Sequence, residues 1–206
     1  MRIGVIGAGH IGSAVAERLV KSGHDVAIAN TRGVDGVRDV AERVGAQPAT
    51  IEDAAGHGDV VFEAIPFGAY ETLPADALKG KVLVDASNYY PGRDGAIDEV
   101  ENGTPSTRLI ADHLDGARVV KAFNTIMASR ITDDHKPAGD PDRLAIPIAG
   151  DDDEAKRIVT QLVDDIGFDA VDAGTLEQSG RQEPGTPVSG PALDADGVRE
   201  ALASPA

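Results

Sequence analysis

Short aliphatic runs alternate with amphipathic segments along most of the chain, and this alternation is the main guide to its fold. Runs rich in Val, Ile, Leu and Ala predict strands at residues 2–6, 26–29, 60–65, 82–84, 119–123, 144–149 and 168–171. Apolar residues at helical spacing predict helices at residues 11–21, 34–44, 50–55, 151–166 and 194–203. Glu63 is the only charged residue in its run.

Two helix starts carry recognisable signals. Thr50 is followed three residues later by Asp53, which resembles a capping box. The helix at 151–166 has the clearest apolar periodicity in the chain, and aspartates at 151–153 stand at its N-terminal end. The helix dipole favours negative charge there, so we interpret this acidic run as helix capping. It lacks the alternating ligands of a calcium loop, and we expect no metal site.

The order of these elements predicts the fold class α/β. Strands that alternate with helices form a mostly parallel sheet covered on both faces, and we expect a Rossmann-type, doubly wound domain over residues 1–172. From residue 173 the composition changes to Gly, Pro, Ser and Asp. We expect residues 173–206 to form a small C-terminal elaboration, with an extended loop at 173–192 and then a short helix, that covers the site.

A glycine-rich turn lies between the first predicted strand and the first predicted helix. Its spacing is the GxGxxG fingerprint of dinucleotide-binding domains, and it comprises Gly7, Ala8, Gly9, His10, Ile11 and Gly12. The first glycine permits a tight turn, the second lets the backbone approach a pyrophosphate, and the third lets helix and strand pack closely. His10 occupies a variable position, and we expect it to contact the cofactor through its backbone.

The end of the second strand indicates which dinucleotide binds. An NAD site places Asp or Glu there, roughly 20 residues past the glycines, to accept from the ribose 2′-hydroxyl. This chain has Asn30, Thr31 and Arg32 instead. An amide, a hydroxyl and a guanidinium can all donate to a 2′-phosphate, and Arg32 should supply most of the attraction, with Arg38 as a further helper. The sequence therefore predicts NADP(H).

Composition narrows the classes of partner. The formal net charge is −16, which disfavours binding to nucleic acid or to an anionic membrane. The chain has no cysteine, which excludes disulfides, thiolate metal sites and cysteine catalysis. The start of the sequence does not read as a signal peptide, and no run is long enough to span a membrane, so we expect a cytoplasmic location.

With these residues in place, the sequence resembles the NADPH-dependent oxidoreductases that use the deazaflavin coenzyme F420. Beyond the glycines, the resemblance is carried by IP at 65–66, VVKAFNTI at 119–126, IPIAGDDDEAK at 146–156 and VDAG at 171–174. Order and spacing match over about residues 1–175. Pyrroline-carboxylate reductases, and the reductase domains of some metal-reducing membrane proteins, look similar at the N-terminus only.

The resemblance implies direct hydride transfer between NADP(H) and coenzyme F420, and it suggests a homodimer. That reaction depends on stacked rings and exclusion of water more than on a side-chain acid or base, so no catalytic residue is assigned. Carried over by position, the cofactor-binding residues include Ile65 and Pro66 along the nicotinamide half. The resemblance also places Asn124 and Thr125 at the ring junction and implies that Ala128 offers its backbone to the carboxamide. Asn124 and Thr125 are equally compatible with a helix N-cap.

Two departures leave the electron partner open. Archaeal members of the family have a histidine at the position of Asn124, and often a proline at that of Met127. Residues 177–191 also lack the long apolar C-terminal helix of those members. A flavin, a quinone or an imine remains an alternative planar acceptor, and a non-catalytic NADP(H) sensor with a protein partner is a third hypothesis.

Overall fold

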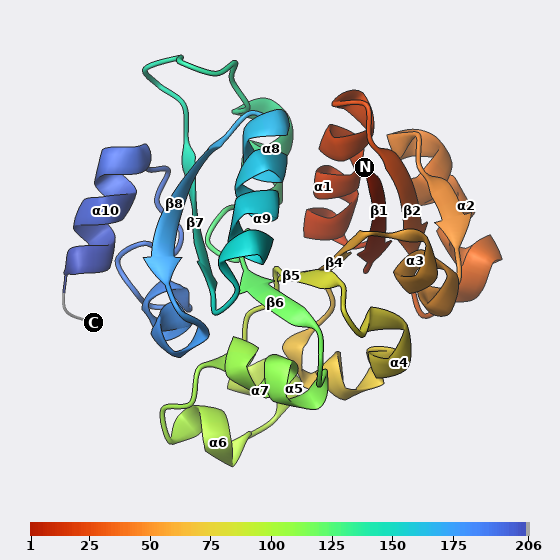
Figure 1. The fold of residues 1–206 in the computed structure, drawn as a ribbon, viewed down its shortest axis with the longest axis horizontal. Helices are drawn as coiled ribbons and strands as arrows, with labels where there is room; N and C mark the ends of the chain where they lie inside the picture. The colour runs from red at the N-terminus through yellow and green to blue at the C-terminus, as the bar shows by residue number, and fades with distance from the viewer. Residues whose placement is uncertain (205–206) are drawn as a thin grey trace.

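Eight strands form one sheet in the order β3-β2-β1-β4-β5-β6-β7-β8 in the computed structural model, which describes residues 1–204 (Figure 1). The strands are β1 (Arg2–Ile6), β2 (Asp25–Ala29), β3 (Gln47–Ala49), β4 (Val60–Glu63), β5 (Val82–Asp85), β6 (Arg118–Lys121), β7 (Ala145–Gly150) and β8 (Asp169–Gly174). All neighbours pair in parallel except β6 and β7, which are antiparallel. The predicted α/β class, with a mostly parallel Rossmann-type sheet, is confirmed.

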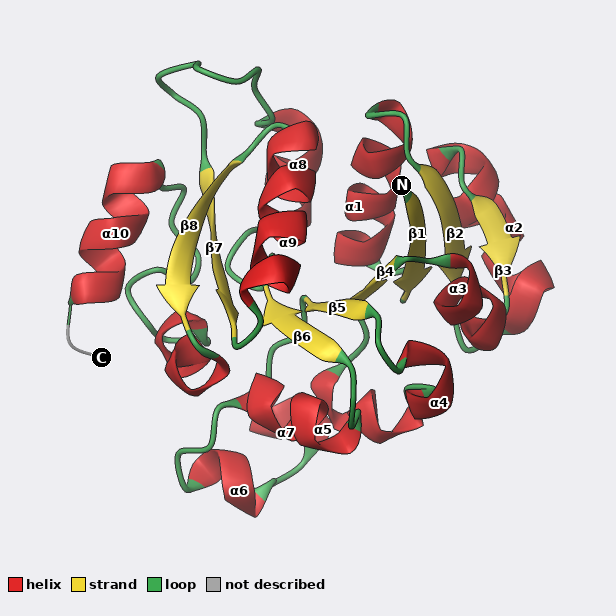
Figure 2. Cartoon of the chain, in the orientation of Figure 1, coloured by secondary structure: helices red, strands yellow, loops and turns green. Residues whose placement is uncertain are grey.

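Helices cover both faces of this sheet (Figure 2). The longer ones are α1 (His10–Lys21), α2 (Gly33–Val44), α3 (Ile51–His57), α7 (Ser106–His113), α9 (Asp153–Asp165) and α10 (Ala195–Ala203). Shorter ones are α4 (Ala75–Leu78), α5 (Pro91–Asp94), α6 (Asp98–Glu101) and α8 (Ala128–Asp133). Two 3₁₀ segments lie at Phe67–Thr72 and Leu176–Gln182. None of the helices within residues 1–204 is long and apolar enough to cross a membrane.

The predicted helix starts are confirmed at the level of single hydrogen bonds. Thr50 accepts from the backbone N–H of Asp53 at 3.0 Å, and so caps α3. Asp152 accepts from the backbone N–H of Ala155 at 2.8 Å at the start of α9. These side chains satisfy donors that have no partner inside the helix.

Other segments differ from the sequence prediction. The expected extended loop at 173–192 was wrong in part, because β8 continues to Gly174 and a 3₁₀ segment follows at Leu176–Gln182. A capping box at Thr175 and Gln178 starts that segment. Strand β3 was missed because it is a three-residue edge strand with Pro48 at its centre and has no apolar run.

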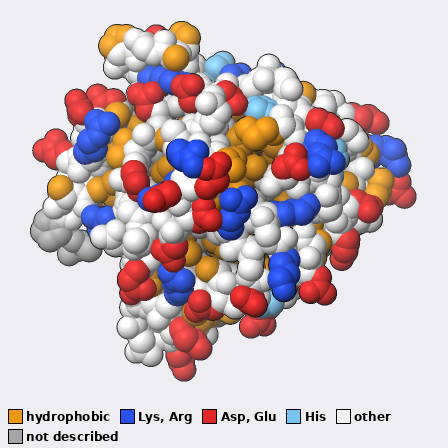
Figure 3. All heavy atoms as spheres, viewed as in Figure 1, with side chains coloured by type: hydrophobic (Ala, Val, Ile, Leu, Met, Phe, Trp, Pro, Cys, Tyr) orange, Lys and Arg blue, Asp and Glu red, His pale blue; other side chains and the backbone are white. Residues whose placement is uncertain are grey.

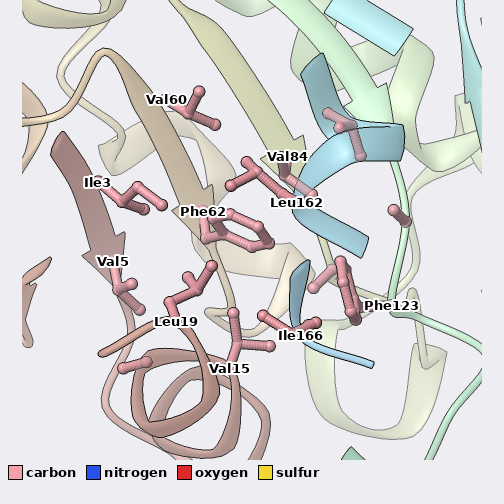
Figure 4. Close-up of a cluster of buried hydrophobic side chains, with 14 of the residues drawn as sticks. Ile3, Val5, Val15, Leu19, Val60, Phe62, Val84, Phe123, Leu162 and Ile166 are labelled. Carbon is pink, nitrogen blue, oxygen red and sulfur yellow. The ribbon is translucent and has the colours of Figure 1, made fainter. Parts of the chain in front are cut away.

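Alternate residues of the central strands divide the core into two layers. On one face, Val60 and Phe62 pack with Val15 and Leu19 of α1 and with Leu162 of α9 (Figure 4). On the other face, the neighbouring residues Val61, Leu83 and Val119 pack against α3, α4 and α7. A smaller cluster joins β7 and β8 to α10. The core is almost entirely aliphatic, in line with an aromatic content of 3%.

Charged side chains of both signs are interspersed over the face shown in Figure 3. Several cations join separate elements. Arg143 donates to Asp164 at 2.7 Å and to Asp169 at 3.0 Å, which ties the end of α9 to the start of β8. Lys81 donates to the carbonyls of Ala55 and Gly58 at 2.5 and 2.7 Å, which satisfies acceptors at the C-terminal end of α3.

Candidate dinucleotide-binding site

A crevice runs along the carboxyl ends of the parallel strands, where ligands bind in open α/β sheets. It consists of two adjoining cavities of about 320 and 600 Å³. The first is lined at one end by Asn30, Thr31 and Arg32, and the second reaches Asn124, Thr125 and Gly190. Both cavities are lined by Gly9, Ala64, Ile65 and Pro66, which therefore form the middle of the crevice.

The three glycines of the fingerprint have three distinct geometric roles. Gly7 has a φ of +113°, a conformation that side chains rarely adopt, and a Cβ there would lie 2.5 Å from the Ala64 carbonyl oxygen. A Cβ on Gly12 would overlap the Gly7 carbonyl oxygen, so this glycine allows α1 to pack on β1. A Cβ on Gly9 would meet nothing within 4 Å and would occupy the crevice. This space, at the N-terminus of α1, fits a pyrophosphate.

Arg32 stands at the far end of the first cavity with an exposed side chain. Among residues 1–204 it forms no ion pair, whereas Arg38 pairs with Asp35 at 2.8 Å and does not line the cavity. Asn30 holds the turn, because its Oδ1 accepts from the Arg32 N–H at 2.8 Å and its Nδ2 donates to Gly36 at 3.0 Å. The geometry therefore leaves Arg32 free to meet an anion, with Asn30 supporting its backbone.

Asn124 lies on the floor of the second cavity and is nearly buried. Its Nδ2 donates to Asn88 Oδ1 at 3.0 Å and to the Gln182 carbonyl at 2.6 Å, and its Oδ1 accepts from Gln182 Nε2 at 3.1 Å. The alternative that Asn124 or Thr125 caps a helix was wrong, because Met127 occupies the N-cap of α8 and no side chain caps it.

The remaining predicted residues lie around this floor. Thr125 lines the second cavity, and its carbonyl accepts from the N–H of Gly190, which brings the C-terminal segment to the crevice. His10 also lines the second cavity, as does Ile11. Ala8 lines the first. Ala128 instead lines a neighbouring hollow beside α1, together with His10 and Ser13, so the structure does not bring it into the crevice.

Phe123 precedes Asn124 and combines burial with an unusual backbone. It is fully buried and its ring contacts that of Phe62, with centroids 5.7 Å apart. Its φ is +66°, the only positive value at a non-glycine residue within 1–204. Such a backbone costs on the order of 1–3 kcal/mol and persists only where the surroundings impose it. Here it turns the chain from β6 into the floor of the second cavity.

Sequence reasoning missed a buried charged cluster beneath the crevice. Glu63, Asp85 and Lys121 end three adjacent strands, where each is the register partner of the next. All three are fully buried, and Lys121 Nζ lies 3.6 Å from Asp85 Oδ2. The sequence does contain an indication of this cluster, because each of the three apolar runs includes one charged residue at or near its end. Charged residues are uncommon in strands that are buried on both faces.

Protonation differs sharply between the two carboxyl groups. Burial raises the pKa of Glu63 well above its ordinary value, and the neighbouring charge of Asp85 raises it further. Burial also opposes ionisation of Asp85, but Lys121 and several hydrogen bonds outweigh it and lower the pKa of Asp85 to about 2. Of the two carboxyl groups, Glu63 therefore holds a proton in preference to Asp85.

The sheet order, the glycine turn and the free cation beyond β2 define a Rossmann-type dinucleotide-binding protein. The sequence profile of the family described as NADP oxidoreductase, coenzyme F420-dependent, matches residues 2–89. Residues 2–89, which run from β1 to just beyond β5, are therefore similar to this family of NADP oxidoreductases.

Individual relatives are similar over a larger part of the chain. The chain is 33% identical to a hypothetical protein from Sinorhizobium meliloti, whose crystal structure matches with a TM-score of 0.83 over 94% of this chain and 95% of that one. A candidate F420-dependent NADP reductase from Arthrobacter sp. FB24 is 27% identical, with a TM-score of 0.74 over 88% and 87% of the two chains.

A curated relative, metalloreductase STEAP3 from Rattus norvegicus, is 31% identical over 180 residues, or 85% of this chain and 34% of that protein. The expectation that metal-reducing proteins resemble this chain at the N-terminus only was wrong. The chain spans about a third of the length of the curated relatives it matches.

Proposed function

We propose that the chain binds NADP(H) along the crevice and transfers hydride between it and coenzyme F420. The observation that carries this proposal is the continuity of the two cavities, from the free Arg32 through Gly9 to the floor at Asn124. An extended dinucleotide needs an anion site at one end and room for a second planar ring at the other. The similarity of residues 2–89 to the coenzyme F420-dependent family supports coenzyme F420 as that second ring.

Different residues of the crevice would bind different parts of NADP(H). The N-terminus of α1, exposed by the missing side chain of Gly9, would hold the pyrophosphate. Thr31 and Arg32 would donate to the 2′-phosphate, and Ile65 and Pro66 would line the nicotinamide half. When bound, the nicotinamide supplies or accepts the hydride. The chain itself has to orient the two rings and exclude water from between them.

The second cavity offers an apolar rim for the acceptor. Tyr90 and Met127 line it and are 44% and 54% exposed, which is high for large apolar side chains. Ser189 and Gly190 complete the wall from the C-terminal segment.

We also propose that residues 1–172 form the NADP(H)-binding domain and that residues 173–206 cover the site. The homodimer also stays a proposal, which light scattering on the purified protein would test.

A second candidate function is reduction of a different, uncharged planar acceptor such as a flavin ring, a quinone or an imine. It is favoured by the charge state of the second cavity. Arg93 lines this cavity, but both Nε and Nη2 donate to Asp94 at 2.8 Å, so its charge is already balanced. An acceptor with an anionic tail therefore gains less there than the NADP(H) phosphate gains at Arg32.

The experiment is to titrate the protein with NADPH and NADH and then to add acceptors. We expect NADPH to bind more tightly than NADH, and oxidised coenzyme F420 to lose its deazaflavin absorbance when both are present. Loss of NADPH with a flavin, a quinone or an imine, but not with coenzyme F420, would favour the second candidate. Absence of NADPH binding would reject both.

A further inference from the structure

Glu63, Asp85 and Lys121 form a buried cluster of three ionisable side chains beneath the crevice. Strands β4, β5 and β6 carry them side by side, and none of the three side chains is exposed. Two carboxyl groups and one ammonium group in such a place cannot all be ionised without leaving a net buried charge. The cluster is neutral when it holds one extra proton.

Hydrogen bonds show which carboxyl group holds that proton. Asp85 Oδ1 accepts from the N–H and the Oγ–H of Ser87 at 2.8 and 2.6 Å, and its Oδ2 accepts from Thr107 Oγ1 at 2.5 Å. Every one of these partners donates, so Asp85 is ionised. Glu63 Oε2 accepts from the Ile65 N–H at 3.2 Å, whereas Glu63 Oε1 is buried without a hydrogen-bond partner. An oxygen that receives no donor is the natural position for the proton, and a protonated Glu63 can donate that proton to Asp85, an interaction that also raises the pKa of Glu63.

Ser87 connects this cluster to the second cavity. Its hydroxyl group contacts Asp85, and the residue also lines the cavity in which the acceptor is proposed to bind. Ser87 is only 4% exposed, so the connection is shielded from bulk water. Lys121 Nζ donates to Ser106 and Thr107 at 3.1 and 2.8 Å and to the Ser87 carbonyl at 3.5 Å, which holds the cation beside Asp85.

We propose that Glu63 stores the proton that accompanies hydride transfer and delivers it through Asp85 and Ser87 to the acceptor. This inference rests on the proposed function. Reduction of a planar acceptor consumes a hydride, which carries two electrons, and one proton. The O–H bond of Glu63 breaks as Asp85 takes its proton. The Ser87 hydroxyl group then turns its own hydrogen from Asp85 toward the acceptor and releases it there, as Asp85 passes a proton to Ser87 Oγ. Glu63 is left as a carboxylate and regains a proton from solvent.

Glu63 and Asp85 act here through Ser87, so their role must be separated from a purely structural one. Glu63→Gln is the suitable variant, because the amide oxygen can still accept from the Ile65 N–H and the side chain is neutral like the protonated acid. It cannot release a proton. Ser87→Ala removes the hydroxyl group at the cavity and leaves Glu63 in place. Glu52→Gln, at an exposed position of α3, is the matched control.

Two measurements are made on each protein. The first is turnover with NADPH and whichever acceptor the wild type reduces, for which Glu63→Gln and Ser87→Ala should each fall about 100-fold, the lower range for general acid catalysis. NADPH affinity should stay within about twofold, as a check on folding, and Glu52→Gln should match the wild type. The second is the infrared absorption spectrum of each NADPH complex at neutral pH, in which a protonated carboxyl group gives a carboxylic acid band without any turnover.

We expect the infrared spectrum to contain a carboxylic acid band in the wild type and in Ser87→Ala, and to lose it in Glu63→Gln. A wild type without such a band, or Glu63→Gln with unchanged turnover, would overturn the proton-storage inference. The proposed function fails on a different result, namely a wild type that binds NADPH and reduces none of the acceptors. In that case a band that disappears in Glu63→Gln still supports Glu63 as the proton store.

Discussion

Asn124 and Gln182 hold each other through two opposed hydrogen bonds, in which Asn124 donates to the backbone of Gln182 at 2.6 Å and accepts from its side chain at 3.1 Å. This pair fastens the segment after β8 to the floor of the second cavity. Because Asn124 also donates to Asn88, its amide nitrogen contacts two acceptors.

Replacing Asn124 by Asp should therefore destabilise the fold. The change puts an acceptor where two acceptors already lie, and we expect the free energy of unfolding in urea to fall by at least about 2 kcal/mol. Asn102→Asp, at an exposed position, is the control and should change it by less than about 0.5 kcal/mol. Equal stability of both variants would show that the network contributes nothing.

Gly12→Ala should damage both the fold and the cofactor site. Its Cβ would overlap the Gly7 carbonyl oxygen, and we expect a loss of about 1–3 kcal/mol, the range for overpacking, together with weaker NADPH binding. Gly56, also in a helix, has open space around its Cβ position. Gly56→Ala should stabilise by about 0.5–1 kcal/mol, measured by thermal unfolding. A Gly12→Ala protein as stable as Gly56→Ala would contradict the close packing of α1 on β1.

Arg32→Glu should weaken NADPH binding by about 1.5–3 kcal/mol and leave NADH nearly unaffected, because only NADPH carries the 2′-phosphate. Fluorescence titration of both dinucleotides measures this difference. Arg38→Glu, on the same helix but outside the cavity lining, tests whether the effect is a general change in charge. If Arg32→Glu weakens both dinucleotides equally, the phosphate pocket lies elsewhere.

The pKa of Glu63 predicts a pH dependence of stability. A carboxyl group with a raised pKa in the folded state contributes stability below its unfolded value of 4.5 and loses that contribution as the pH rises from there toward the folded value. The wild type should therefore lose stability relative to Glu63→Gln above about pH 4.5, by up to about 1.4 kcal/mol per pH unit. Urea unfolding at pH 4, 6 and 8 would measure it, and a constant difference would argue against a buried protonated Glu63.

Lys121→Met should destabilise strongly. Methionine fills much of the same space, but it leaves the Asp85 carboxylate buried without its cation, and breaking a buried pair in this way costs about 3–5 kcal/mol. The double variant Lys121→Met with Asp85→Asn, which removes both charges, should recover part of the loss. No recovery in urea unfolding would mean that the packing of Lys121, and not its charge, stabilises the cluster.

The sequence predicted features that depend on local pattern. The glycine turn, the cap at Thr50 and the periodicity of α9 are each specified within a few residues, and each is present. Features that depend on partners distant in sequence were missed or misread. The helix cap considered for Asn124 was wrong, because the partner of its side chain, Gln182, lies 58 residues away. The cluster of Glu63, Asp85 and Lys121 appears only when three strands align in register.

At position 123, the packing of the core and the conformation of the backbone favour different types of residue. The core requires a large aromatic ring to fill the space beside Phe62, whereas the left-handed backbone favours glycine, which has no ring at all. No amino acid of the standard set meets both requirements: glycine would relax the backbone and lose the packing, whereas another aromatic residue would keep the packing and the unfavourable backbone. Phe123 therefore marks a point at which the chain gives up some thermodynamic stability and keeps the shape of the second cavity.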